Sequence, residues 1–381
     1  MLTNADIAEL TALRRDLHRF PDVSRDEGPT AARITAALAA LAPDQVMTGL
    51  GGHGVAAVVR GAAPGPTVLF RAELDGLPIE ELSVAAHRST LPGKGHLCGH
   101  DGHMTMLMAL GRLLSRQRPA RGRVVLMFQP AEEDGSGAAA VTADPAFAAI
   151  RPDWAFAIHN LPGVPFGQVR LAPGVVNCAS QGLKITLTGK TAHASQPETG
   201  TSPARALSHL IPAMTALGQG GVLIPGYRLV TVTHARLGAP AFGIAPGEAE
   251  LWVTLRTLED GAMAALRAEA VTLAETAAAA DGLSLTLTTH DDFAASVNHP
   301  EAAACVAAAL DALHIPHSTE DLPMRASEDF GRFGAAPTRS AMLFLGAGEM
   351  AALHNPDYDF PDDLTPIGAR IFARIARDIL R

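Results

Sequence analysis

Gly95-His-Leu-Cys-Gly-His-Asp-Gly-His103 holds one Cys, one Asp and three His in nine residues. Cys98, His100 and His103 are of the ligand types that zinc, nickel, cobalt and manganese sites use. The apolar run Met104 to Leu114 follows and predicts a buried helix, with the cluster on the loop that feeds its N-terminus. A Gly-rich turn with exposed histidines is the alternative. We favour a metal site, because burying several histidines without partners is costly.

Apolar strands on either side of this cluster end in polar, chelating or acidic residues. Thr67–Arg71 leads into Asp75, Arg123–Phe128 breaks at Gln129-Pro-Ala-Glu-Glu133, and Trp154–Ile158 ends at His159. Open α/β sheets place their sites at such strand ends. The strands alternate with helical segments such as Asp6–Arg19, capped by Thr3 or Asn4, and Pro29–Leu41. The fold class we predict is therefore α/β, with a mixed, largely parallel sheet and helices on both faces.

The pattern changes between residues 181 and 291. Strands with period-two alternation and two helices follow one another in the order β-α-β-β-α-β, the ferredoxin-like arrangement. These segments are Leu183–Thr188, Pro203–Leu217, Leu229–Arg236, Ala249–Arg256, Gly261–Ala280 and Leu283–Thr289. After residue 291 the earlier pattern, apolar strands that alternate with helical segments, resumes. We predict an α+β domain, residues 181–291, inserted into a catalytic domain of residues 1–180 and 292–381. One face of the inserted sheet would carry both helices and leave the other to solvent or a partner chain.

The amino-acid composition and net charge indicate some classes of function and argue against others. Apolar residues make 48% and charged residues 18% of the 381 residues, which suits a cytosolic globular enzyme of two domains. The net charge of -9 argues against nucleic acid or an anionic membrane as a partner. The three cysteines have no paired spacing, which indicates a reducing compartment. No targeting signal or membrane-length apolar run is visible, so we expect a cytoplasmic protein.

Polar residues that end the apolar segments form a candidate ligand set. They are Cys98, His100, Glu133, His159 and His354. Five ligands of mixed Cys, His and carboxylate type exceed what one tetrahedral ion needs, and they suit two ions that share a bridging ligand. Zinc and manganese are the metals we expect, while cobalt and nickel accept the same ligand types.

Such a centre needs a base to take the proton of the attacking water, and Glu132 precedes Glu133 directly. Neighbouring residues point in different directions, so one carboxylate can bind metal while the other faces the water. A solvated acidic turn is the alternative. We favour the base, because the pair follows a buried strand and a Gln-Pro turn.

These residues belong to motifs through which the chain resembles a known family. It is similar to amidohydrolases of the hippurate hydrolase and indoleacetyl-amino-acid hydrolase type, in the aminoacylase and zinc carboxypeptidase superfamily. The motifs occur in the family's order along nearly the whole chain. They are Leu17-His-Arg-Phe-Pro-Asp22, Phe70-Arg-Ala-Glu-Leu-Asp-Gly-Leu-Pro78, His96-Leu-Cys-Gly-His-Asp-Gly-His103, Phe128-Gln-Pro-Ala-Glu-Glu133, Ala157-Ile-His159, Gly189-Lys-Thr-Ala-His193, Ser327-Glu-Asp-Phe330 and Leu353-His354-Asn-Pro.

The resemblance implies a dinuclear centre built from the five ligands above, with Glu132 as base. It also implies that the inserted domain is a lid that forms a homodimer through its exposed sheet. His193 would bind the substrate carbonyl or its oxyanion, often across the dimer, although locally it is a His in a polar loop. Asp101 and Asp75 are candidates for orienting ligand imidazoles, with helix capping and an exposed turn as alternatives. Arg256 is a candidate for binding a substrate carboxylate, and a solvated edge arginine is the alternative.

Three positions depart from the family pattern. Gly243 stands where similar enzymes usually carry an Asn in the lid, Gln181 where they often carry an acid, and Asp22 where the first motif usually ends in Glu. None of these removes a ligand or the base, so the departures concern specificity more than reaction type.

We therefore predict a metal-dependent amidohydrolase that cleaves the amide of small N-acyl amino acids or similar conjugates. A dipeptidase or carboxypeptidase that uses the same centre on a peptide bond is the near alternative. A non-catalytic dimer that binds metal or ligand is the alternative from another class, and the intact base argues against it. The acyl group, the amino acid and the metal are not specified by the sequence.

Overall fold

The protein divides into two compact units in the computed structural model, which describes all of residues 1–381. The first unit comprises Met1–Val176, Ser296–Leu322 and Glu328–Arg381, and the second comprises Asn177–Ala295 and Pro323–Ser327. The sequence predicts boundaries at 181 and 291 instead, and it places residues 323–327 in the catalytic domain.

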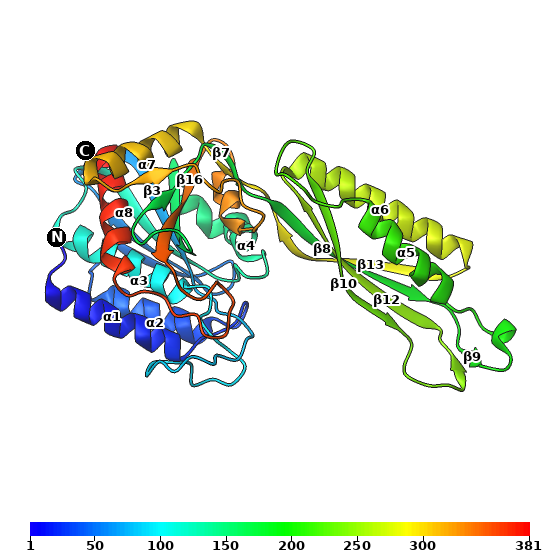
Figure 1. The fold of residues 1–381 in the computed structure, drawn as a ribbon. Coiled ribbons are helices and arrows are strands. Elements are labelled where there is room, and N and C mark those ends of the chain that lie inside the picture. The colour runs from blue at the N-terminus through cyan, green and yellow to red at the C-terminus, as the bar shows by residue number, and fades with distance from the viewer. The chain divides into compact units, whose positions relative to one another are not determined.

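An eight-stranded mixed sheet forms the centre of the first unit (Figure 1). Its order is β1-β2-β4-β3-β5-β16-β6-β15, and the pairs β4–β3, β3–β5 and β5–β16 are parallel. The strands are β1 (Gln45–Leu50), β2 (Gly54–Arg60), β3 (Ala63–Glu73), β4 (Arg121–Gln129), β5 (Trp154–Pro162), β6 (Val169–Arg170), β15 (His317–Ser318) and β16 (Arg339–Gly348). A short pair, β7 (Gly174–Asn177) with β14 (Ser296–Asn298), lies outside this sheet. The predicted fold class is confirmed.

Helices cover both faces of this sheet. They are α1 (Asn4–Arg19), α2 (Gly28–Ala39), α3 (His100–Arg116), α4 (Gly137–Ala143), α7 (Pro300–Leu313) and α8 (Leu364–Leu380), with 3-10 turns η1 (Pro145–Ile150) and η3 (Asp329–Gly334). On one face α3 and α8 pack against β3, where the ring of Phe70 meets that of Phe372. Side chains alternate along a strand, so Arg71 faces the other side and meets Asp329 of η3.

Local signals account for the start of two helices. Thr3 caps α1, because its hydroxyl accepts from the Asp6 N–H while the Asp6 carboxylate accepts from the Thr3 N–H. Helix α3 begins at His100, so the metal-type residues extend into its first turn and do not end before it. Gly102 is required there, because a Cβ at this position would lie 2.3 Å from the ring of Phe360.

The second unit has the ferredoxin-like order that the sequence predicts. Its sheet runs β10-β12-β8-β13, all antiparallel, and Figure 1 shows both long helices on one face of it. The elements are β8 (Ala179–Thr188), α5 (Ala204–Ala216), β10 (Arg228–Leu237), β12 (Glu248–Thr257), α6 (Asp260–Ala280) and β13 (Ser284–Phe293). β9 (Ala192–His193), β11 (Ile244–Ala245) and the 3-10 turn η2 (Pro197–Thr199) complete the unit. Along β12, Leu251 and Val253 are buried toward the helices, while Trp252 is exposed on the other face.

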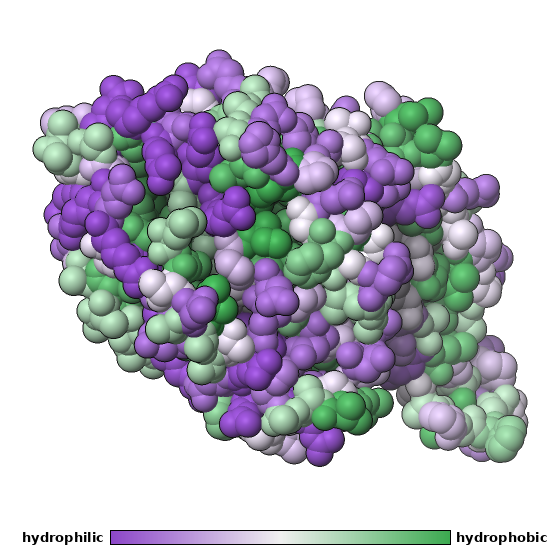
Figure 2. Space-filling view, turned by 60° about the vertical axis from the view of Figure 1, so that its left-hand side comes forward, coloured by the Kyte–Doolittle hydropathy of each residue, from purple (hydrophilic) through white to green (hydrophobic).

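Polar side chains cover most of the face that Figure 2 shows, with apolar side chains scattered among them. None of the helices is long and apolar enough to span a bilayer.

Candidate active site

The five predicted ligands converge at the carboxyl ends of the central parallel strands. Cys98 precedes α3, His100 begins it, and Glu133 follows β4. His159 lies within β5 rather than at its end, and His354 lies in the loop after β16. Two overlapping triads have ligand atoms within 4.8 Å of one another: Cys98 with His100 and His159, and Cys98 with Glu133 and His354. Cys98 is common to both triads.

The nitrogen–oxygen distances within the cluster are longer than direct hydrogen bonds. His100 Nε2 lies 3.8 Å from Glu133 Oε1, and His354 Nε2 lies 3.7 Å from Glu133 Oε2. Cys98 Sγ lies 3.5 Å from His159 Nε2. Both His100 Nε2 and Glu133 Oε1 are buried without a hydrogen-bond partner. Buried polar atoms left without partners are costly, so these atoms fit a bound cation.

The tautomers of two histidines also fit a metal centre. His100 Nδ1–H donates to the Asp75 backbone oxygen at 2.8 Å, and His159 Nδ1–H donates to the Asn160 backbone oxygen at 2.7 Å. In the neutral form of each ring, Nε2 is therefore the unprotonated nitrogen. It faces the cluster, with His100 Nε2 near Glu133 and His159 Nε2 near Cys98. This is the arrangement that metal-binding histidines use, with the second nitrogen fixed by a carbonyl or carboxylate.

The loops that carry the ligands adopt unusual backbone conformations. His354 has φ +67°, in the left-handed region, and its N–H donates to the Leu97 oxygen at 2.8 Å. Ala131, just before the two glutamates, has φ +49°, and its N–H donates to the buried carboxylate of Glu27 at 2.7 Å. Non-glycine residues in this region are strained, and such strain concentrates at functional sites.

Glu132 lies beside the ligands and belongs to neither of the two triads that share Cys98, although its carboxylate also lies within 4.8 Å of ligand atoms of His100 and Glu133. Its side chain is almost completely buried, and its Oε2 lies 3.8 Å from His100 Nε2. Burial, with Glu328, Glu133 and Asp329 nearby, raises the pKa of Glu132 well above its ordinary value. Each of these effects favours the protonated carboxyl, so this group accepts a proton more readily than an exposed glutamate does.

Asp75 and Asp101 occupy different surroundings. Asp75 is buried, and its Oδ2 accepts from the Glu133 N–H at 3.0 Å and from the Ser24 hydroxyl at 2.8 Å. Asp75 thus fixes the backbone of one ligand directly. Asp101 Oδ2 instead lies 2.9 Å from His18 Nδ1 and 3.3 Å from Arg14 Nη1. Its hydrogen-bond partners are therefore a histidine and an arginine of helix α1 rather than the imidazole of a candidate ligand.

The buried His18 predicts a pH dependence of stability. Burial alone would lower the pKa of His18, but Asp101 and Glu81 outweigh it and raise this pKa from 6.5 to about 10. The protonated ring therefore stabilises the fold fully below about pH 6.5, and this contribution is lost as pH rises toward 10. Replacing His18 with Gln should lower the free energy of unfolding at pH 6 by about 3 kcal/mol. Chemical denaturation from pH 6 to 10 tests this prediction. If the free energy of unfolding of His18→Gln changed with pH as steeply as that of the wild type, the prediction would be contradicted.

A buried ion network that was not predicted from the sequence lies behind Glu132. The Arg71 guanidinium donates to Glu328 Oε1 at 2.7 Å, to Asp329 Oδ1 at 2.6 Å and to Glu73. With Glu132, four carboxylates surround one guanidinium, and burial together with this crowding of carboxylates raises the pKa values of Glu132 and Asp329. The signals in the sequence were the charged residues at the end of an apolar strand and the Ser327-Glu-Asp-Phe330 motif, whose Glu328 was a candidate to lie near the site.

His193, Gly243 and Arg256 belong to the second unit. His193 is exposed, with Nδ1 2.7 Å from the Ser195 hydroxyl, and it pairs with Ile244, the neighbour of Gly243, in the small β9–β11 sheet. Gly243, which stands where similar enzymes usually carry an Asn, is thus adjacent to His193. Arg256 Nη1 donates to the Ser327 hydroxyl at 2.6 Å and to the Arg325 oxygen.

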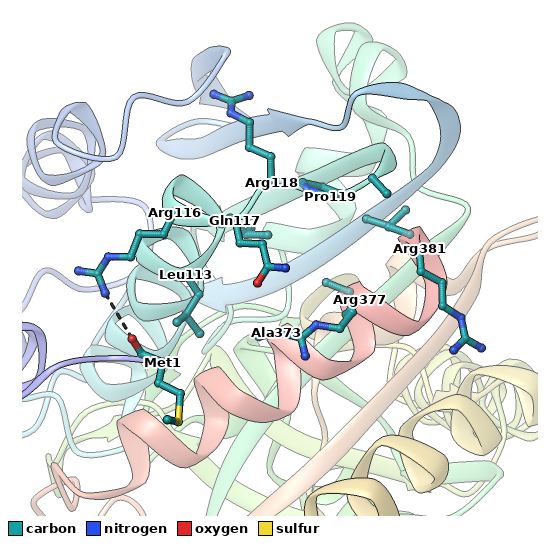
Figure 3. Close-up of a pocket in the computed structure, with 13 residues that line it drawn as sticks. Met1, Leu113, Arg116, Gln117, Arg118, Pro119, Ala373, Arg377 and Arg381 are labelled. Atoms are coloured by element: carbon teal, nitrogen blue, oxygen red, sulfur yellow. Dashed lines mark hydrogen bonds between the residues drawn. The ribbon is translucent and has the colours of Figure 1, made fainter.

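A cavity of about 580 Å³ lies at the C-terminal turns of α3 and α8, away from the ligands (Figure 3). Arg377 and Arg381 line it beside Leu113 and Ala373, and Arg116 reaches the Met1 oxygen across its edge. It contains none of the candidate ligands, and we assign it no part in the reaction.

Comparison with known proteins identifies the family whose members this chain resembles. Residues 69–378 match the family described as Peptidase family M20/M25/M40. An IAA-amino acid hydrolase of Arabidopsis thaliana is 29% identical over 96% of this chain and 86% of its own length. The hippurate hydrolase of Campylobacter jejuni is 28% identical over 98% of this chain and 97% of its own.

Solved structures share the fold. A protein from methicillin-resistant Staphylococcus aureus superimposes with a TM-score of 0.85 at 26% identity, covering 99% of this chain and 97% of its own. A Bacillus subtilis structure, described as a dinuclear metal-binding peptidase of the M20 family, gives 0.82 at 23% identity over 100% and 99%.

The chain is a metal-dependent hydrolase of the amidohydrolase and peptidase type. More specifically, it belongs to the M20/M25/M40 peptidase family. The resemblance inferred from the motifs is therefore confirmed.

Proposed function

We propose that this enzyme hydrolyses the amide bond of small N-acyl amino acids, with two divalent ions per subunit and Glu132 as general base. One observation carries the proposal: nitrogen, sulfur and oxygen donor atoms of five residues converge beside the buried carboxylate of Glu132, whose pKa is raised. Zinc or manganese suits this mixed donor set, and cobalt and nickel are compatible with it.

The five ligands divide into the two triads that share Cys98, and these triads would hold the two ions. When bound, the ions would supply Lewis acidity to the amide carbonyl and to the attacking water. Glu132 takes the proton of that water, because its raised pKa suits a proton acceptor. It then returns the proton to the amide nitrogen as the C–N bond breaks, so that an acid and an amine leave.

The names of the relatives support an acylated amino acid as substrate. They include an IAA-amino acid hydrolase, a hippurate hydrolase and an N-acetyldiaminopimelate deacetylase of Enterococcus faecalis, the last 34% identical over 66% of this chain. Each name describes an acyl group joined to an amino acid or amino-acid derivative. A dipeptide would place an ammonium group where these compounds carry a neutral acyl chain.

A matched substrate pair tests the proposal. N-acetylalanine and glycylalanine release the same amino acid. They differ only at the carbon attached to the carbonyl group, where the acetyl group has a hydrogen and the glycyl group has an ammonium group. We expect kcat/KM to be at least tenfold higher for N-acetylalanine, or for a longer N-acylalanine, than for glycylalanine, roughly 1.4 kcal/mol of discrimination. Alanine release that is faster from the dipeptide would reassign the enzyme to the peptidase alternative.

We further propose that the second unit forms a homodimer through its exposed sheet face and that His193 contributes to carbonyl binding. The exposed Trp252 on this face and the exposed position of His193 support the proposal. An oxyanion donor contributes about a hundred- to a thousandfold, so His193→Ala should lower kcat by that factor without loss of metal. Sedimentation at micromolar concentration should show a dimer, and a monomer with full activity would contradict both points.

A further inference from the structure

Asn160 is a fully buried polar residue that directly follows the ligand His159 in β5. Its own atoms belong to neither metal triad. We propose that Asn160 is a positioning residue that holds three ligand-bearing segments in register, through its backbone, its amide group and its packing. The inference rests on the ligand set proposed above.

The backbone of Asn160 orients His159. The carbonyl oxygen accepts from His159 Nδ1–H at 2.7 Å, which turns Nε2 toward Cys98. His103 holds residue 160 from the other side, because its Nε2 lies 3.1 Å from the Asn160 nitrogen and 2.7 Å from the Asn160 Oδ1. The other nitrogen of His103 is 2.7 Å from Glu73, so both ring nitrogens have partners within the protein.

The amide of Asn160 connects β5 to the segment that carries His354. Its Nδ2 donates to the Tyr358 hydroxyl at 2.6 Å, and both side chains are fully buried. Tyr358 follows His354 by four residues, and the Tyr358 N–H donates to the Asn355 oxygen at 3.1 Å. The hydrogen bond between Asn160 and Tyr358 therefore anchors the loop just after the ligand.

The same amide packs against the peptide between two further ligands. A Cβ at Gly99 would lie 2.3 Å from Asn160 Oδ1 and 2.8 Å from the Tyr358 hydroxyl. Gly99 also has φ +93°, and it stands between Cys98 and His100. Only glycine allows this approach, so the amide defines the surface on which the Cys98–His100 backbone rests.

Asn160 thus contacts the three segments that supply Cys98 and His100, His159 and His354. Groups that orient ligands without binding metal themselves are each worth about ten- to a hundredfold in metal affinity. Replacing Asn160 with Ala removes the amide and frees both Tyr358 and the Gly99 peptide. We expect the variant to bind cobalt(II) about ten- to a hundredfold more weakly than the wild type.

Cobalt(II) titration of the full-length apoprotein, in competition with a chelator, tests the inference. The visible absorption bands report coordination geometry, and a near-ultraviolet charge-transfer band reports the bond to the Cys98 thiolate. In Asn160→Ala we expect shifted bands as well as weaker binding, which loss of stability alone does not produce.

Asn298→Ala is the matched control. Asn298 is another buried asparagine of the first unit, and its Nδ2 donates to the Ala172 and Met342 oxygens at 2.9 Å each. Its replacement should lower stability and leave the cobalt spectrum and affinity unchanged. Tyr358→Phe serves if Asn160→Ala does not fold, because it removes only the hydroxyl partner and should weaken binding roughly three- to tenfold.

The outcomes separate this inference from the proposed function. A wild-type protein without the thiolate band would overturn the ligand set, and the role of Asn160 with it. A wild-type protein with that band, together with wild-type affinity and spectrum in Asn160→Ala or Tyr358→Phe, would overturn the role of Asn160 alone.

Discussion

Replacing Glu132 with Gln is expected to slow amide hydrolysis by about a hundred- to ten-thousandfold while both metal ions stay bound. The amide of Gln has nearly the same shape as the carboxylate but cannot accept the proton of the attacking water. Burial, with Glu328, Glu133 and Asp329 nearby, raises the pKa of Glu132 well above its ordinary value. Glu133 instead lies between His100 and His354, where a ligand is needed.

Metal analysis and steady-state kinetics on the same samples check this prediction. The loss should appear in kcat with little change in KM, because the base acts in the chemical step. Glu9→Gln is the matched control, since Glu9 is exposed on α1 and pairs only with Arg112 at the surface. A Glu132→Gln enzyme that keeps more than a tenth of wild-type kcat would remove Glu132 from the role of base.

Replacing His100 with Ala should have an effect at least as large, through the metal centre itself. His100 has ligand atoms near Cys98 and His159 on one side and near Glu132 and Glu133 on the other. It is fully buried, and its Nδ1 is already fixed by Asp75. Groups that only orient ligands contribute about ten- to a hundredfold, so loss of this ligand should weaken metal binding by more than about a hundredfold.

Equilibrium dialysis with zinc or manganese measures the affinity of His100→Ala, and amine release measures its turnover. His209→Ala, an exposed histidine on α5 of the second unit, is the control and should behave as wild type. Retention of two tightly bound ions by His100→Ala would contradict the ligand assignment, even if activity were lost.

The convergence of the five candidate ligands was predictable because of sheet topology. The strands β4, β3 and β5 are parallel neighbours, so their carboxyl ends meet at one edge of the sheet. Polar residues that follow those strands are therefore close together, although they are far apart in the sequence. The ferredoxin-like unit was predictable for a similar reason, because its strands alternate buried and exposed residues along their length.

The residues that support the ligands could not be found in this way. Arg71 and Glu328 are 257 positions apart, and no local pattern links them. Asn160 and Tyr358 resemble ordinary core residues until their hydrogen bond is seen. Strand β1 was missed because it is a mostly exposed edge strand whose register comes from pairing with β2 rather than from its own pattern.

Amine release by metal-free and reconstituted protein tests the central claim most directly. The apoprotein, prepared with a chelator, is titrated with zinc or manganese, and the bound ions per chain are measured together with hydrolysis of an N-acyl amino acid. The account predicts no turnover without metal and full activity at two ions per chain. Undiminished hydrolysis by the metal-free protein would contradict it.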